Sequence, residues 1–147
     1  EKPLCLNEGE LEEIVGAYQQ ASHLESPPAL TVGYNRRFAP MVMLLKEQLS
    51  KINEPLMLNF RVNAGFLPPG HWVHDAQQGG GRLLGEGCHF IDLLIHLTGQ
   101  RVVNVSGRTL PDSGRYSHDN FALTLQFTDG SVGCLTYLSN GDVRAGK

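Results

Sequence analysis

The chain is poor in several kinds of residue, and each scarcity excludes a class of protein. Its 147 residues include only three cysteines, an odd and scattered set that cannot build a disulfide framework. No apolar run is long enough to cross a bilayer, and no basic start leads into the apolar block of a signal peptide. Free thiols without a leader are typical of a reducing compartment, so we expect a cytoplasmic protein.

Charge of one sign is also scarce, because 12 Lys and Arg residues against 15 Asp and Glu residues give a formal net charge of -3. A nucleic-acid surface needs clustered positive charge, so we expect neither a nucleic-acid nor a membrane partner. Hydrophobic residues make up 41% of the chain, which is enough for a real core. The start at Glu1 rather than at methionine, and the end at Lys147 soon after a strand-like stretch, predict a fragment of a longer protein.

Hydrophobic periodicity predicts the order helix, strand, helix, strand, helix and then several strands. Asn7 and Glu10 have the spacing of a capping box before the first helix, Pro40 suits the first turn of the second, and Gly99 suits the end of the third. The predicted strands are residues 29–34, 56–62, 102–106, 121–127 and 132–138. The last two are joined by a hairpin turn. We therefore expect an α+β fold, with a mostly antiparallel open sheet and helices packed on one face.

The most informative stretch is residues 79–92, which read Gly-Gly-Gly-Arg-Leu-Leu-Gly-Glu-Gly-Cys-His-Phe-Ile-Asp. The three leading glycines allow the backbone to approach a ligand closely, because no Cβ stands in the way. His89 and Asp92 are three residues apart and share a helix face. An imidazole with an acidic neighbour is suited to proton transfer near neutral pH. A buried helix whose histidine is merely hydrogen-bonded would produce the same local pattern, and both interpretations stay open.

Further side chains are candidates for ligand binding. Arg36 and Arg37 follow a predicted strand and could grip a carboxylate or phosphate, or form ordinary surface salt bridges. Asn63 ends a predicted strand, and the long loop that follows carries Trp72 and His74, where Trp72 could stack on a sugar or belong to the core. Zinc accepts the ligand types offered by His71, His74, Cys88 and His89. No C-x-x-C or H-E-x-x-H motif is present, however, so we expect no metal site.

Three motifs, in this order, resemble the glucose-fructose oxidoreductase and inositol dehydrogenase (Gfo/Idh/MocA) family: Glu1-Lys2-Pro3, residues 32–38 and residues 79–92. The resemblance implies a dinucleotide-binding domain followed by a sheet domain for a sugar or polyol. Residues 1–28 would then be the last helix region of the first domain, and residues 29–147 a truncated substrate-binding and dimerisation domain. No G-x-G-x-x-G follows a predicted strand, so NAD or NADP would be held by a part that precedes this chain, with Glu1, Lys2 and Pro3 at its edge.

The resemblance also implies roles for single residues. Lys2 matches a lysine near the nicotinamide and the substrate hydroxyl, and His89 matches the histidine that accepts the hydroxyl proton as hydride leaves. Asp92 matches an acid one turn later that acts as a structural partner. Gly85 departs from the family pattern, because many members have an aspartate there. Glu86 is adjacent but lies about 100° further round a regular helix, so the proton path could involve Glu86, Lys2 or water.

The leading hypothesis is the substrate-binding half of an NAD(P)-dependent oxidoreductase that acts on a sugar, nucleotide sugar or polyol. The subgroup with these motifs often occurs in polysaccharide pathways. We expect the chain alone to be inactive and the parent to form a homodimer or higher oligomer through the sheet. The expected catalytic residues are Lys2, His89 and Glu86. The expected substrate-binding residues are Arg36, Arg37, Asn63, Trp72, His74 and Asp92. The alternatives are a non-catalytic ligand-binding or assembly domain of the same fold and, less favoured, a small metal-dependent hydrolase.

Overall fold

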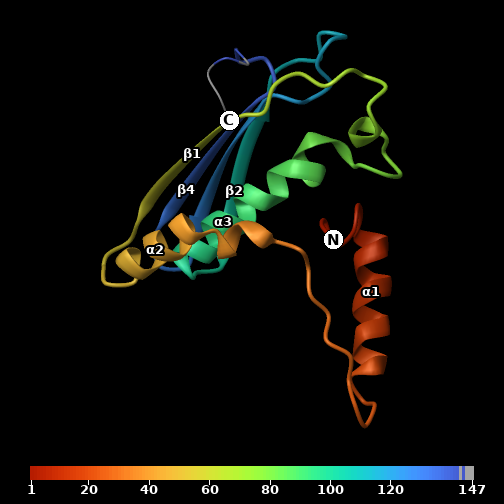
Figure 1. Cartoon of the computed structure of the whole chain (residues 1–147), viewed down its shortest axis with the longest axis vertical. Helices are drawn as coiled ribbons and strands as arrows, with labels where there is room; N and C mark the ends of the chain where they lie inside the picture. Colours follow the sequence, from red (N-terminus) through yellow and green to blue (C-terminus); the bar gives the residue numbers. More distant parts are fainter. Residues whose placement is uncertain (143, 145–147) are drawn as a thin grey trace.

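The computed structural model describes residues 1–142 and 144. Its α-helices are α1 (Glu8–Ala21), α2 (Pro40–Leu49) and α3 (Cys88–Thr98). Its shorter helical turns are η1 (Asn35–Phe38), η2 (Trp72–His74) and η3 (Leu83–Gly87). Its strands are β1 (Met57–Asn63), β2 (Val102–Thr109), β3 (Phe121–Phe127) and β4 (Val132–Leu138). Helices α2 and α3 lie against the sheet, whereas α1 projects from it on an extended connection (Figure 1).

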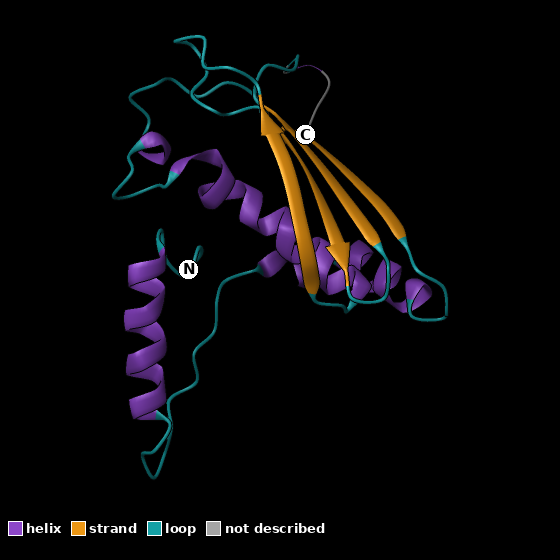
Figure 2. Ribbon diagram, turned by 180° about the vertical axis from the view of Figure 1, so that it is seen from behind, coloured by secondary structure: helices purple, strands orange, loops and turns teal. Residues whose placement is uncertain are grey.

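The strands form one sheet in the order β1-β4-β3-β2. The pairs β2–β3 and β3–β4 are antiparallel, and β1 pairs with β4 in parallel. Figure 2 shows the helices on one face of this sheet, with the other face uncovered within the described residues. The expected α+β class, with a mostly antiparallel open sheet and helices on one face, is confirmed.

Alternation along β3 sets the two faces of the sheet. Phe121, Leu125 and Phe127 are buried on the helix side and Leu123 is partly buried there, whereas Ala122, Thr124 and Gln126 on the other face are exposed. Leu94 of α3 packs into this core and is fully buried. A helix that presents an apolar face to a sheet removes that surface from water, which is the main favourable term in folding. The core therefore fixes the position of α3, whose first turn carries His89.

The predicted strand at residues 29–34 is wrong. This segment is extended, but it joins no strand of the sheet in the described part of the chain. Its backbone hydrogen bonds are local or reach the first residue: the N–H of Gly33 donates to the carbonyl of Glu1 at 3.2 Å. Leu30 is half exposed. The apolar pattern indicated an extended segment correctly, but a strand also requires a neighbour with which to pair.

The third helix begins later than expected. Regular α-helix starts at Cys88 and ends before Gly99, whose left-handed φ of 71° makes it the expected terminator. The preceding turn, η3, is a wider π-helical turn. A Cβ on Gly87 would lie 3.0 Å from the Phe121 ring, and one on Gly79 would lie 2.4 Å from the backbone of Val73. The prediction that the three leading glycines admit a ligand is therefore corrected at Gly79, where the glycine admits the backbone of Val73 instead.

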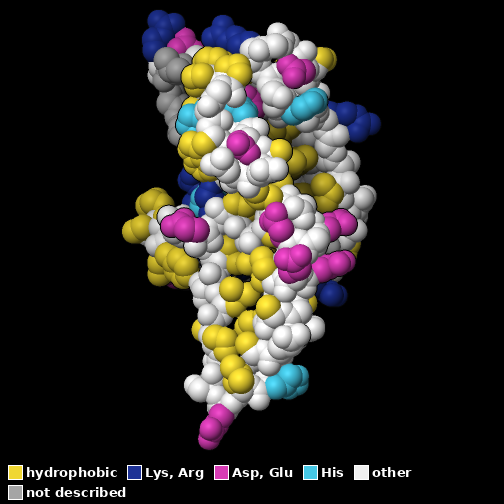
Figure 3. Space-filling view, turned by 90° about the vertical axis from the view of Figure 1, so that its right-hand side faces the viewer, with side chains coloured by type: hydrophobic (Ala, Val, Ile, Leu, Met, Phe, Trp, Pro, Cys, Tyr) yellow, Lys and Arg dark blue, Asp and Glu magenta, His cyan; other side chains and the backbone are white. Residues whose placement is uncertain are grey.

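Helix α1 has the predicted cap but a different environment from the other helices. The side chain of Asn7 accepts from the N–H of Glu10 at 2.9 Å, which confirms the capping signal. Its apolar stripe, however, is exposed, with Leu11 at 39% and Tyr18 at 43%. Figure 3 shows hydrophobic side chains running along the projecting part of the molecule, beside acidic ones. Within the described residues, none of the helices is both long and apolar enough to traverse a membrane.

Candidate active site

A cavity of about 250 Å³ collects several of the predicted residues. It is lined by side chains or backbone of Lys2, Arg36, Trp72, Val73, Gly85, Glu86 and His89. These residues come from the N-terminal segment, η1, η2, η3 and the first turn of α3. Five candidates that are far apart in the sequence therefore meet in one place. A small concave pocket with few convergent polar groups is the usual form of a site for a small molecule.

The N-terminal segment is bonded to the cavity wall at Gly85 and to the extended segment at Gly33. The Nζ of Lys2 donates to the carbonyl oxygen of Gly85 in η3, and the N–H of Gly33 donates to the carbonyl of Glu1. Gly85 is buried, and a Cβ added there would lie 3.0 Å from the carbonyl oxygen of Gly79. The backbone at Gly85 thus holds the lysine, and the space that an acidic side chain would need at this position is taken by the loop.

His89 is half-buried on the cavity wall. Its Nδ1 is enclosed and has no hydrogen-bond partner among the described residues. The ring meets Tyr34 edge to face, with 6.1 Å between centroids. Burial, together with the positive charges of Lys2 and Arg36, lowers the pKa of His89 from 6.5. The imidazole is therefore neutral at pH 7 and able to accept a proton.

The two adjacent arginines have different environments. Arg37 turns toward α3, where its Nε donates to Oδ2 of the buried Asp92 at 2.7 Å and its guanidinium makes a second contact with Oδ1. Arg36 lines the cavity with its guanidinium carbon 4.5 Å above the centre of the Phe90 ring. A guanidinium stacked on a ring keeps its N–H groups available at its edge. Arg36 is thus placed for a ligand, and Arg37 is occupied by an ion pair that anchors η1 to α3.

Two residues of the site were missed from the sequence. Arg82 is 3% exposed, and its Nη1 donates to Oε1 of Glu86 at 2.6 Å. Tyr137 of β4 donates its hydroxyl to Oε2 of the same carboxylate at 2.5 Å. The spacing of Arg82 and Glu86, opposite charges four residues apart, was a usable signal. Nothing local in β4 could have indicated Tyr137.

The remaining predicted residues lie outside the cavity lining. Asn63 donates from Nδ2 to the carbonyl of Asp142 at 2.8 Å. His74 faces Asp119, with 3.6 Å between Nδ1 and Oδ1, and burial raises the pKa of Asp119. Across the described residues, no group of three or more His, Cys, Asp or Glu side chains is arranged to hold a metal ion. The hydrolase alternative therefore lacks a ligand cluster in this part of the chain.

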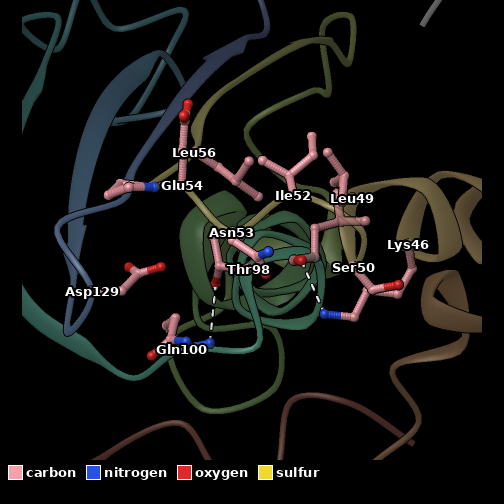
Figure 4. A pocket seen from close by; sticks show the side chains of 12 residues that line it. Lys46, Leu49, Ser50, Ile52, Asn53, Glu54, Leu56, Thr98, Gln100 and Asp129 are labelled. Atoms are coloured by element: carbon pink, nitrogen blue, oxygen red, sulfur yellow. Dashed lines mark hydrogen bonds between the residues drawn. The ribbon is translucent and has the colours of Figure 1, made fainter.

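A second cavity, of about 400 Å³, lies at the opposite end of α3 from His89 (Figure 4). It is bounded by the end of α2, the connection to β1 and the end of α3. Lys46 donates from Nζ to the carbonyl of Leu97 at 3.0 Å, which satisfies one of the free carbonyls at the helix end. None of the predicted site residues is among the residues that line this second cavity. The candidate catalytic residues therefore gather at the start of α3.

The comparisons with known proteins agree with this geometry. Residues 47–142 match the family model described as the GFO/IDH/MocA C-terminal domain. The chain belongs to the GFO/IDH/MocA family. Over 80 residues it is 36% identical to glucose-fructose oxidoreductase domain-containing protein 2 of Bos taurus and 35% identical to that of Homo sapiens. The matched region is 52% of this chain, and only 21% of the length of those relatives is covered.

Solved structures show the same fold. The chain superposes on the NAD-binding protein from Listeria innocua with a TM-score of 0.77 and 25% identity, covering 95% of this chain and 41% of that one. The aldose-aldose oxidoreductase from Caulobacter crescentus gives a TM-score of 0.78 at 20% identity, with 92% and 41% covered. This GFO/IDH/MocA chain therefore spans less than half of the proteins that it resembles in structure, and most of their length lies outside the match.

Proposed function

We propose that this GFO/IDH/MocA chain is the substrate-binding half of an NAD(P)-dependent oxidoreductase that acts on a sugar, nucleotide sugar or polyol. The observation that carries the proposal is the meeting of Lys2 and a neutral His89 in one small cavity. A carbon that loses hydride must also lose the proton of its hydroxyl, and these two side chains supply a cation and a proton acceptor for that oxygen. The family membership and the structural neighbours support the same class of reaction.

The roles of the residues follow from their positions. Lys2 is held by the carbonyl of Gly85, so its ammonium can stabilise negative charge on the reacting oxygen without reorganising. His89 takes the proton, because its enclosed Nδ1 and lowered pKa keep the ring neutral. Arg36 and Trp72 bind the substrate at the rim, with Trp72 60% exposed. The bound dinucleotide supplies only the hydride-accepting carbon.

The cofactor is held by a domain that precedes this chain. Residues 1–28 are the last helix region of that domain, and the exposed apolar stripe of α1 fits this assignment. Glu1, Lys2 and Pro3 reach the edge of the cofactor site, because Lys2 already lines the cavity. Arg37 and Asp92 support the substrate site indirectly through their ion pair, whereas Asn63 and His74 do not line the cavity.

This proposal predicts different behaviour for the full-length protein and for the isolated chain. The full-length protein, incubated with NAD or NADP and a panel of sugars and polyols, is expected to form reduced dinucleotide at 340 nm, roughly the usual absorbance of the reduced nicotinamide ring. The isolated chain is expected to bind neither dinucleotide tightly in calorimetry, because it contains no phosphate-binding loop. Micromolar affinity of the isolated chain for a dinucleotide, or a full-length protein that binds cofactor but never turns over, contradicts the proposal.

We also propose that the parent protein is a homodimer or higher oligomer through the uncovered face of the sheet. The outward residues of β3 are small or neutral: Ala122, Thr124 and Gln126. A sheet face of this kind is readily covered by a second copy.

Sedimentation of the full-length protein is expected to give at least twice the mass of one chain. Thr124→Arg should shift the protein toward the monomer, whereas Glu25→Arg, on an exposed turn, should not. A monomer at high concentration contradicts this prediction.

A further inference from the structure

Both oxygens of the Glu86 carboxylate accept hydrogen bonds from residues of the protein core. Oε1 accepts from Arg82 at 2.6 Å, and Oε2 accepts from the hydroxyl of Tyr137 at 2.5 Å. Both donors are themselves buried, with Arg82 3% and Tyr137 0% exposed. Charge-assisted bonds of this length are the strong class of hydrogen bond, and two of them leave the carboxylate little freedom to turn.

The two donors are fixed in turn by the core. Arg82 also donates to the carbonyl of Gly65 at 2.5 Å. The ring of Tyr137 stacks on Phe121, with 4.8 Å between centroids and 3° between planes. Burial and the adjacent carboxylate raise the pKa of Tyr137, so its hydroxyl stays protonated and remains a donor. The two hydrogen bonds to Glu86 therefore come from residues fixed in the core of the sheet domain, and they form without any ligand.

The charges that line the cavity explain why a fixed Glu86 carboxylate is useful there. Among the described lining residues, Lys2 and Arg36 are the cations and Glu86 is the acid. A proton accepted by His89 would add a third positive charge to this small space, and nearby like charges oppose it. A carboxylate fixed beforehand offsets that charge without waiting for solvent to reorganise, which is the efficient way to stabilise charge that develops during a reaction.

We propose that Arg82 and Tyr137 are positioning residues that hold the Glu86 carboxylate in a fixed orientation on the cavity wall, where it stabilises protonated His89. This proposal rests on the proposed function. It assigns Glu86 an electrostatic role rather than that of a proton carrier, because each of its oxygens already accepts a hydrogen bond from a buried donor. The charged and titratable groups facing His89 are Lys2, Arg36, Glu86, Asp92, Tyr34 and Cys88.

The decisive variant is Tyr137→Phe in the full-length protein, because it removes one hydroxyl and keeps the stacked ring. Its matched control is Leu135→Val, a change at a fully buried apolar residue of the same core cluster on the same face of β4. We expect Tyr137→Phe to lower kcat about 10-fold and Glu86→Gln about 10–100-fold, the range for a lost bond to a charged group, with KM little changed. Arg82→Lys, which keeps the charge but loses the planar fork, should retain more activity than Arg82→Met.

A second measurement does not depend on turnover. The pKa of the His89 imidazole can be followed by NMR titration in the full-length protein, with its signal assigned from His89→Asn. Glu86→Gln should lower this pKa, because a fixed negative charge is lost, and Leu135→Val should leave it unchanged. The proposal is overturned if Glu86→Gln does not move the His89 titration, or if Tyr137→Phe behaves like Leu135→Val in kcat. If the full-length protein turns over no substrate, the proposed function is wrong. The NMR titration still tests the interaction between Glu86 and His89, because it does not require turnover.

Discussion

Replacing His89 by alanine in the full-length protein is expected to lower kcat by about 10²–10⁴-fold while KM changes little, because a general base acts mainly in the transition state. The imidazole lies on the cavity wall beside Lys2 and is kept neutral by its surroundings. Steady-state kinetics on the parent protein, with the cofactor saturating, is the measurement. Retention of wild-type turnover by folded His89→Ala would remove His89 from the chemistry and favour a non-catalytic binding domain.

His96 provides the matched control for this prediction. It is a second half-buried histidine on the same helix, close to the other end of α3, and it does not line the cavity. His96→Ala removes the same side chain from the same helix and should leave kcat within about 3-fold of the wild type, as expected away from the reacting atoms. Equal losses in the two variants would indicate damage to α3 rather than loss of a base.

The pH dependence follows from the direction of the His89 shift. Because its pKa lies below 6.5, the imidazole remains neutral through pH 6.5 and becomes protonated only at lower pH. A protonated ring cannot accept the substrate proton, so kcat/KM should fall with decreasing pH along a limb below pH 6.5. The same shift affects stability with the same sign: the unfolded chain binds this proton first, so the contribution of His89 to stability is lost as pH falls below 6.5.

The second large effect is expected on stability, from Arg37→Met. This change leaves the carboxylate of Asp92, whose side chain is 7% exposed, without its guanidinium partner. Arg37 itself is partly exposed, but its removal leaves the buried carboxylate without a donor, and we expect a loss of about 2 kcal/mol in the free energy of unfolding. Chemical denaturation of the full-length protein, followed by circular dichroism, is the measurement.

The neighbouring arginine is the natural comparison for Arg37→Met. Arg36→Met makes the same substitution one residue earlier, at an exposed side chain that stacks on Phe90 and forms no ion pair with the described residues. It should cost less than about 1 kcal/mol in stability but raise KM for the substrate. If both variants lose the same stability, the ion pair between Arg37 and Asp92 does not anchor η1 to α3.

The sequence by itself determined much of the local structure. The caps at Asn7 and Gly99, the proline that opens α2 and the alternation along β3 and β4 are short-range signals, and each appears where it was expected. Together they imply a sheet with one buried face, which confirms the fold class. The family was also recoverable, because its motifs combine residue types in a fixed order.

The tertiary structure decided which partners each residue has. Arg36 and Arg37 are equivalent in the sequence, yet one lines the cavity and the other pairs with a buried acid on α3. The apolar run at residues 29–34 reads as a strand, but pairing depends on a neighbour that this segment does not find in the described sheet. Tyr137 looks like an ordinary inward-facing strand residue, and only the tertiary contact between β4 and η3 gives its hydroxyl the carboxylate of Glu86 as a partner. Periodicity reports which side of an element faces the core, whereas the partner on that side is chosen by packing between segments that are distant along the chain.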